Sequence, residues 1–400
     1  MARNREFRFL LGARTISHIG DGMALVALLL YVHETRASGL AVGALLLAAT
    51  VPVLVVGPIA GTVVDRTDQR RLMIVCDGAR LVLYGAVAIF LPAFPVLLAL
   101  VAFAAVFDTL FSPAGRSVVP ALVAHDDLRP ANAWLGISLN LQVVLGPLLG
   151  GVLSDAVGVR AAIAANALTF ALSALLLARL PSLAPEAVEG EARPRFLADI
   201  RAGFAYVATH RAARVIVGSL FLGVTFAAVD NVALVFLARD ELGSGPLGFG
   251  SAAAAFGVGM LAASTILVSP RLKVPAATLF VLGMFLNGLG TLATGLAPVL
   301  LVATGFQALA GTGNGVQVVA SDTLVQETVT RSMLGRVFGL VQLAAVAGSS
   351  VAALAGGLLL DLTSARAVFV IGGTGVLAVL ALTWLFLVRE PGAGLGRTQS

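Results

Sequence analysis

The sequence has few charged residues, one lysine and one cysteine. Only 12% of its 400 residues are Asp, Glu, Lys or Arg, about half of the roughly 25% that is typical of soluble domains. Cys76 is the only cysteine, so a disulfide within the chain is excluded. The net charge of +5 does not indicate a nucleic-acid surface, because the basic residues recur between apolar runs and do not gather in one polar domain. The composition therefore excludes an ordinary soluble domain.

Motifs for ATP use and for catalysis are also missing from the sequence. No Gly-x-x-x-x-Gly-Lys-Ser/Thr phosphate loop occurs, which disfavours an ATP-driven pump. No Gly-x-Ser-x-Gly nucleophile motif occurs, and no apolar run holds His, Asp and Glu at metal-ligand spacing. A membrane-embedded enzyme is thus a disfavoured alternative, and we expect neither a metal nor a cofactor.

Long apolar runs fill the chain instead. Hydrophobic residues make up 58% of it, the mean hydropathy is +0.98, and 44 glycines allow membrane helices to approach closely. Because a membrane span needs roughly 20 mainly apolar residues, we predict twelve spans: Leu10–Val32, Leu40–Val64, Leu72–Leu91, Pro95–Val119, Ala133–Val157, Ala161–Leu180, Val215–Leu237, Leu247–Val268, Ala276–Leu296, Val299–Ala320, Val337–Leu360 and Ala367–Val388.

The distribution of basic residues predicts the orientation of these spans. With the N-terminus inside, the cytoplasmic segments and the span ends next to them hold 20 Lys and Arg residues, whereas the outer loops hold 4: Arg36, Arg160, Arg239 and Arg366. Lys and Arg concentrate on the cytoplasmic side of membrane proteins. We therefore expect a multi-pass protein of a bacterial plasma membrane with both termini in the cytoplasm.

The longest polar stretch divides the chain into six spans and six spans. We predict an N-terminal bundle over 1–180, a cytoplasmic linker over 181–214, and a C-terminal bundle with a short cytoplasmic tail over 215–400. In the linker, apolar side chains recur at helical spacing from Phe196 to Val207, which indicates an amphipathic helix on the membrane surface. A solvated linker is the alternative.

A repeated string relates the two bundles to each other. Residues 150–155 read GGVLSD and residues 356–361 read GGLLLD, and each string is followed by Arg-Ala at the same spacing. The offset is constant (361 − 155 gives 206). Such a repeat is expected of a transporter built from two parallel six-helix halves. The fold class that we predict is an all-α membrane protein of twelve helices in two pseudo-symmetric six-helix bundles.

The loop between the second and third predicted spans carries the most specific motif. Residues 61–71 read GTVVDRTDQRR, which resembles the Gly-x-x-x-Asp-Arg-x-Gly-Arg-Arg/Lys signature of the major facilitator superfamily, with Asp68 in place of the second glycine. The resemblance implies a gating role for Gly61, Asp65, Arg66, Arg70 and Arg71. The Asp65 carboxylate can face a helix N-terminus, and the arginines can pair with it or with lipid headgroups.

A second motif favours export. Residues 146–151 read GPLLGG and resemble the end of the antiporter motif found in drug-exporting branches of the same superfamily. Proline removes a backbone donor and glycine removes side chains, so Gly146, Pro147, Gly150 and Gly151 are candidate hinge residues, with ordinary glycine-rich packing as the alternative. Strings at 111–114 (FSPA), 119–123 (VPALV), 203–207 (GFAYV) and 335–339 (GRVFG) resemble macrolide-efflux and enterobactin-exporter-like members.

Ionisable residues inside the predicted spans are the candidate functional groups, because each costs roughly 2.5–3.5 kcal/mol to place in a membrane. Arg14, His18 and Asp21 share one stripe of the first span by their spacings of four and three. Asp21 is the candidate proton-carrying carboxylate, and a static Arg14–Asp21 network is the alternative.

Two further sets of charged residues lie in later spans. Asp77, Arg80 and Asp108 are predicted to meet at similar depth between the third and fourth spans as a structural or gating cluster. Asp230 and Asn231, nearer the outer side, are candidates for an outer gate, a second proton site or a cation contact. A solvated helix end is the alternative reading of this pair.

These observations predict a monomeric secondary transporter. We expect it to export an amphipathic organic compound, such as a drug or a macrolide-like or siderophore-like metabolite, by proton antiport with alternating access. Its partners are then the substrate, protons and membrane lipids, without nucleic acid, and the proton gradient is its energy source. A lipid or lysolipid flippase and a small-solute importer are the alternatives on the same fold.

Overall fold

A computed structural model describes residues 4–183, 196–267 and 274–387, and every regular element in these ranges is a helix. The predicted linker residues between 184 and 195 and the predicted tail from residue 388 lie outside the described residues.

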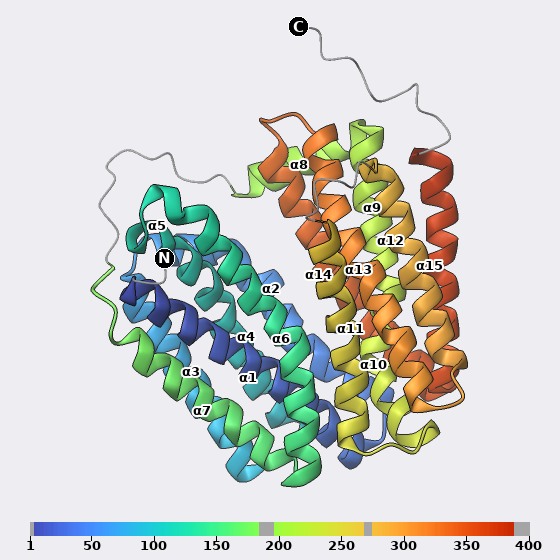
Figure 1. Cartoon of the computed structure of the whole chain (residues 1–400), viewed down its shortest axis with the longest axis horizontal. Coiled ribbons are helices and arrows are strands. Elements are labelled where there is room, and N and C mark those ends of the chain that lie inside the picture. Colours follow the sequence, from blue (N-terminus) through green and yellow to red (C-terminus); the bar gives the residue numbers. More distant parts are fainter. Residues whose placement is uncertain (1–3, 184–195, 268–273, 388–400) are drawn as a thin grey trace, which may run out of the picture. The chain divides into compact units, whose positions relative to one another are not determined.

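The helices follow one another along the chain (Figure 1). They are α1 (Arg5–Arg36), α2 (Gly39–Asp65), α3 (Gln69–Phe90), α4 (Phe94–Ser117), α5 (Val119–Leu122), α6 (Leu128–Ala156), α7 (Val159–Leu177), α8 (Phe196–Thr209), α9 (Arg211–Ala227), α10 (Asp230–Phe236), α11 (Pro246–Leu267), α12 (Ala276–Leu296), α13 (Leu300–Thr328), α14 (Leu334–Leu362) and α15 (Ala365–Leu387). A 3-10 turn, His125–Asp127, precedes α6, and a π-helical turn, Leu237–Glu241, follows α10.

The predicted spans correspond to these helices. Within the described ranges, eleven helical segments are long and apolar enough to cross a membrane, counting α9 through the π-helical turn as one. The remaining long helix is α13, whose 29 residues reach the required length. Its hydropathy is lowered by polar residues on its inner turns, among them Gln307, Asn314 and Gln317.

One predicted span is not continuous. The run Val215–Leu237 was expected to form a single helix, but α9 ends at Ala227 and α10 begins at Asp230. The side-chain amide of Asn231 donates to the carbonyl of Ala228 at 3.2 Å, which satisfies a backbone acceptor that the break exposes. The break therefore places Asp230 at the first position of a new helix.

The chain divides into two compact units. Unit 1 comprises Met1–Ala37, Ala44–Ala192 and Ser244–Ala254, and unit 2 comprises Ser38–Gly43, Arg193–Gly243 and Ala255–Ser400. The first turn of α2 thus belongs to unit 2, and the first turns of α11 belong to unit 1.

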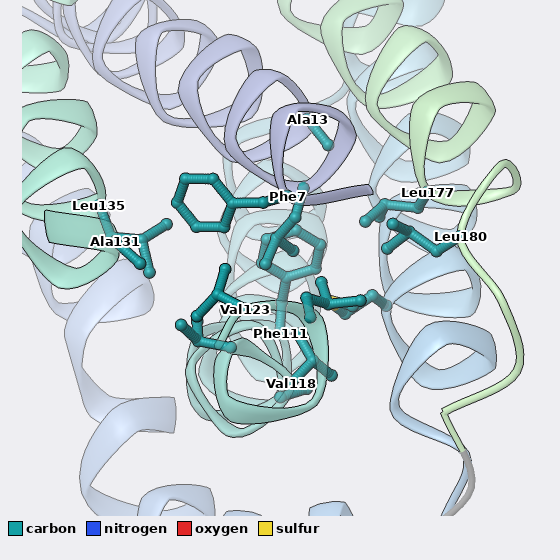
Figure 2. Close-up of a cluster of buried hydrophobic side chains, with 14 of the residues drawn as sticks. Phe7, Ala13, Phe111, Val118, Val123, Ala131, Leu135, Leu177 and Leu180 are labelled. Atoms are coloured by element: carbon teal, nitrogen blue, oxygen red, sulfur yellow. The ribbon is translucent and has the colours of Figure 1, made fainter. Parts of the chain in front are cut away.

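Unit 1 is held together at one end by apolar side chains from seven helices, α1 to α7. Figure 2 shows Phe7 of α1, Phe111 of α4, Ala131 and Leu135 of α6 and Leu177 of α7 converging on one cluster. In the same unit, α1 packs along α6 and α7, and α3 packs along α7 and α4. This packing fixes the inner faces of α1, α3 and α4 relative to one another.

Unit 2 is built around the closely packed pair α12 and α13, with α15 also against α12. Its core contains Phe280 and Met284 of α12 and Leu324 of α13, which are all buried. Glycines permit the close approach of the two helices: a Cβ on Gly313 would stand 2.6 Å from the carbonyl oxygen of Gly283. Such a contact is too short for a real methyl group, so the helix pair depends on glycine at this point.

Replacing Gly313 by alanine tests this packing. We expect Gly313→Ala to lower the free energy of unfolding by about 1–3 kcal/mol, the usual range when a core is overpacked. The apparent melting temperature in detergent should fall accordingly. Gly305→Ala, on the same helix with nothing within 4 Å of its Cβ position, is the matched control and should be neutral or slightly stabilising because alanine favours helix. Equal melting temperatures for the two variants would contradict the packing argument.

Candidate functional site

A pocket with a mainly apolar wall lies inside unit 1, among α1, α2, α3, α4 and α6. Its volume is about 250 Å³. Most of its wall is apolar and comes from Leu25, Leu28, Leu45, Ala49, Val101, Ala104, Ala105 and Leu139. The polar and aromatic part of the wall consists of His18, Asp21, Arg80, Tyr84, Asp108, Ser112 and Gln142. An apolar wall with a few convergent polar groups is the usual form of a small-molecule site.

Arg80 of α3 is the centre of the polar part. One guanidinium nitrogen donates to both carboxylate oxygens of Asp21 at 2.5 Å, and the same nitrogen lies 3.5 Å from Asp108. Asp77 lies 3.7 Å from the other terminal nitrogen. The predicted Asp77–Arg80–Asp108 cluster is thus present, and Asp21 joins it from α1.

Aromatic rings surround the same guanidinium. Its carbon lies 4.1 Å from the ring centre of Phe170 on α7 and 5.9 Å from that of Phe111 on α4. A cation over an aromatic face is stabilised by the negative face of the ring. Arg80 is therefore held both by carboxylates and by rings, on a side chain that is only 3% exposed.

The carboxylates around Arg80 differ in their access to the pocket. The side chain of Asp77 is fully buried, that of Asp21 is 17% exposed, and that of Asp108 is 47% exposed. Asp108 is therefore the carboxylate that a solute in the pocket meets first. The sequence did not predict that Asp108 is more exposed than Asp77, because the exposure of each side chain depends on the helices that face it.

Arg14 and His18 lie beside the cluster on α1. Arg14 is buried, and its guanidinium donates to the carbonyl of Ser112 at 3.4 Å. The alternative in which Arg14 pairs with Asp21 is therefore wrong: the ion-pair partner of Asp21 is Arg80. His18 is buried in the pocket wall, and its Nε2 atom has no hydrogen-bond partner among the described residues.

Asp230 and Asn231, the other residues predicted to bind protons or substrate, lie in unit 2. Asp230 is partly exposed at the break between α9 and α10, and Asn231 is exposed beside it. Both residues lie outside the pocket of unit 1. Among the uncharged polar span residues, Gln142 lines that pocket, whereas Asn287, Gln307 and Gln317 are buried in unit 2.

The motif between α2 and α3 forms a hydrogen-bonded loop. Asp65 is the last residue of α2, and both Asp65 and Arg66 are exposed. Arg70 donates to the carbonyls of Leu177 and Ala178 at 3.3 and 2.5 Å and so caps the end of α7. Gly61 has open space around its Cβ position, and Arg71 is exposed.

Asp68, which departs from the superfamily signature, has a structural role in this loop. It caps α3 by accepting from the backbone amide of Arg71 at 3.0 Å, and it accepts from the Ser182 hydroxyl at 2.5 Å. Burial alone would raise the pKa of Asp68, but hydrogen bonds from Ser182 and from the amides of Arg71 and Leu183 outweigh it, and the pKa lies below its usual value. Sequence reasoning missed this role because Ser182 lies far away along the chain.

The glycines of the GPLLGG string bring helices into direct backbone contact. A Cβ on Gly146 would stand 2.6 Å from the Cα of Gly22 on α1, and one on Gly150 would stand 2.7 Å from the carbonyl of Met23. A Cβ on Gly151 would stand 3.0 Å from the Cα of Gly250 on α11, and Pro147 lies inside α6. These residues therefore permit close packing, and their role as a hinge stays a prediction.

Comparison with known proteins identifies the family. A model of the transmembrane secretion effector family matches residues 2–395. The chain belongs to this family, which is a family of membrane transporters in the efflux branch of the major facilitator superfamily and not one of enzymes.

Three curated relatives cover most of the chain. The uncharacterized MFS-type transporter YfiS of Bacillus subtilis (strain 168) is 28% identical over 94% of this chain and 91% of its own length. The enterobactin exporter EntS of Escherichia coli (strain UTI89) is 29% identical over 96% of this chain and 92% of its own length. Macrolide efflux protein A of Streptococcus pyogenes is 24% identical over 84% of each chain.

A solved structure confirms the predicted fold class. The structure of a mutant of the nucleoside transporter NupG superimposes on this chain with a TM-score of 0.77. The match covers 96% of this chain and 100% of the NupG chain, at 12% sequence identity. The fold is therefore the all-helical major facilitator fold, and the protein is a multi-pass membrane protein.

Neutralising Arg80 tests its place in the cluster. Arg80→Gln leaves three carboxylates without their central cation. We therefore expect it to lower the free energy of unfolding by about 3–5 kcal/mol, the usual cost of breaking a buried ion pair. The double variant Asp21→Asn/Arg80→Gln should recover part of the lost melting temperature. Arg331→Gln, at an exposed position, is the control. A double variant no more stable than Arg80→Gln would show that Asp21 and Arg80 do not depend on each other.

The depressed pKa of Asp68 predicts a pH-dependent contribution to stability. Because its pKa in the folded protein lies below the value in the unfolded chain, the contribution is present above the unfolded value and is lost as pH falls through the folded value. Asp68→Ala should cost about 1 kcal/mol at pH 7, as for the loss of a helix cap. The gap in melting temperature between wild type and variant should close on acidification, and a gap that does not change with pH would refute the prediction.

Proposed function

We propose that this protein exports an amphipathic organic compound in exchange for protons. The single observation that carries the proposal is the half-exposed carboxylate of Asp108 beside the Arg80–Asp21 ion pair in an apolar pocket. The relatives named for macrolide efflux and enterobactin export support export of a large organic solute.

The coupling to protons rests on a charge imbalance in the pocket. Three carboxylates, those of Asp21, Asp77 and Asp108, have the guanidinium of Arg80 as their shared ion-pair partner. With all four groups ionised, the carboxylates outnumber the cation that they contact, and Arg14 and the exposed Arg116 offset the excess only from a greater distance, which is costly in a partly buried site. A proton and a cationic substrate both lower this cost at Asp108, and they exclude each other because both need the same carboxylate oxygens. Mutual exclusion of proton and substrate is the requirement for antiport.

The proposed route of the proton follows from the fact that Asp21 and Asp108 share Arg80 as a partner. Asp21 and Asp108 both contact the same guanidinium nitrogen of Arg80. When the exposed carboxylate of Asp108 takes a proton, Arg80 pairs with Asp21 alone. When Asp21 is protonated instead, Arg80 can pair fully with Asp108. We therefore propose Asp21 as the coupling carboxylate and Asp108 as the group that exchanges protons and cations with the pocket.

The shape and wall of the pocket set the substrate class. Apolar side chains capture a solute by area, at about 25 cal/mol per Å² buried, with little need for directional contacts. A sugar would need many fixed hydrogen-bond partners because its hydroxyls lose water on entry. We propose amphipathic substrates that are neutral or cationic, with the cationic group at Asp108.

The remaining assignments rest on the sequence. We propose that the protein lies in a bacterial plasma membrane as a monomer with both termini in the cytoplasm, because basic residues dominate the segments on that side. Asp65 is proposed as a cytoplasmic latch with Arg66 and Arg71, and Asp230 with Asn231 as a second polar site. The proton gradient is the proposed energy source, and no cofactor is required.

A transport assay in proteoliposomes tests the coupling. With an imposed pH gradient, the wild type should drive accumulation of a macrolide or a cationic dye such as ethidium, and Asp21→Asn should abolish the gradient-dependent part. Asp126→Asn, an exposed carboxylate in the loop before α6, is the matched control and should behave as wild type. Full gradient-driven transport by Asp21→Asn would remove Asp21 from the coupling mechanism.

The substrate class is tested by a split between cationic and neutral compounds. In a host without its own efflux pumps, Asp108→Asn should reduce tolerance of cationic dyes about tenfold, the effect of losing roughly 1.4 kcal/mol of binding, with a smaller effect on neutral compounds. Uptake of a sugar, or flipping of a labelled lysolipid, without any change in tolerance would favour the importer or the flippase instead.

A further inference from the structure

Two arginines at one end of unit 1 share a single aromatic ring. The guanidinium carbon of Arg5, at the start of α1, lies 5.4 Å from the ring centre of Phe9, and that of Arg179, which follows the end of α7, lies 5.8 Å from the same centre. Both arginines are exposed, and neither has a carboxylate partner among the described residues. The ring stabilises each cation through its negative face, but it supplies no anion to balance the two charges.

Hydrogen bonds fix the two chain segments that carry these arginines. At the start of α1, the side chain of Asn4 caps the helix by accepting from the amide of Phe7 at 3.1 Å. At the other segment, Arg70 donates to the two carbonyls that end α7. Because Arg70 already caps α7, the guanidinium of Arg179 is not needed there. The pair of cations is therefore held in place before any ligand arrives, which lowers the entropy cost of binding one.

An exposed apolar stripe on α7 leads to this pair. Leu168, Leu172 and Leu175 are 67%, 46% and 65% exposed, and their spacings of four and three place them on one face of the helix. Arg179 comes four residues after the last of them. Leu177 instead points into the buried cluster of unit 1 (Figure 2). In a multi-pass membrane protein, an exposed leucine face of this kind contacts the acyl chains of lipids.

The cations and the stripe match the two parts of a phospholipid. Guanidiniums donate charge-assisted hydrogen bonds to phosphate oxygens, and the leucines accommodate an acyl chain. The proposed orientation puts this end of unit 1 on the cytoplasmic side, where the membrane surface is negatively charged. A zwitterionic headgroup would bring its own ammonium close to Arg5 and Arg179, whereas an anionic headgroup adds no positive charge. The charges therefore favour an anionic phospholipid.

We propose that Arg5, Phe9 and Arg179 form a binding site for the phosphate of an anionic phospholipid, with one acyl chain along the leucine stripe of α7. The bound headgroup joins the start of α1 to the end of α7 and so stabilises unit 1. The proposal holds for any substrate and any coupling ion, so it goes beyond the proposed function.

Lipid binding to the delipidated protein in detergent tests the site. Dioleoyl phosphatidylglycerol is titrated, bound lipid is counted by native mass spectrometry, and the rise in melting temperature gives a second readout, because a ligand that binds the folded state stabilises it. Arg5→Gln and Arg179→Gln should each weaken binding about fivefold, and the double variant about 25-fold, from the usual contribution of one arginine near a lipid surface. Phe9→Leu should weaken binding less than either.

Matched controls separate the site from general charge and from headgroup chemistry. Arg129→Gln removes the same charge from an exposed position at the start of α6 in the same unit, and it should bind the lipid as the parent does. Dioleoyl phosphatidylcholine has the same acyl chains with a zwitterionic headgroup, and it should stabilise the protein less. Glycerol 3-phosphate offers the phosphate without the chains, and it should compete only weakly.

The outcomes that would overturn the proposal are distinct. Parental affinity of the double variant Arg5→Gln/Arg179→Gln would show that the lipid binds elsewhere, and equal stabilisation by phosphatidylcholine would show that charge does not matter. Full competition by glycerol 3-phosphate at the concentration of the lipid would reveal a site for soluble phosphates and would overturn the lipid assignment. The measurement uses neither a transported substrate nor a pH gradient, so failure of the proposed function would leave its result unchanged.

Discussion

Arg80 carries a fixed positive charge in the interior of unit 1, and its surroundings are arranged to accommodate that charge. An arginine in the middle of a membrane span is tolerated when carboxylates and other polar groups replace the water it has lost. Asp21, Asp77 and Asp108 bring these carboxylates from α1, α3 and α4, and the ring of Phe170 covers one face of the guanidinium. The three acids depend on Arg80 in turn, so any change in the charge of one of them is felt on three helices at once.

The polar cluster can form only because the helices around it approach closely. Gly22 on α1 has its Cβ position 2.5 Å from the carbonyl of Gln142 on α6, just one residue from Asp21. Side chains larger than hydrogen at Gly22 or Gly146 would move α6 outward and take Gln142 away from the pocket. The abundance of glycine in the sequence is thus part of the site, because it sets how near the polar groups of neighbouring helices can come.

The sequence predicted the features that depend on one helix or on depth in the membrane, and missed those that depend on which helix lies opposite. Twelve apolar runs were enough for the fold, and counting residues from the span ends brought Arg80 and Asp108 to one level. The partner of Asp21 was not predictable, because spacing on α1 identifies Arg14 as a neighbour but says nothing of α3. The break before Asp230 was missed for a local reason: residues 226–229 contain neither glycine nor proline.

The two compact units are not the two halves of the sequence. Each unit takes a short segment, Ser38–Gly43 or Ser244–Ala254, from a helix that otherwise belongs to the other unit. A chain cut in the middle would therefore give two pieces that are each incomplete, because each piece would lack a helical segment that packs in its own unit. Splitting this protein into two separately expressed fragments would therefore have to respect the borders of the compact units and not the midpoint of the sequence.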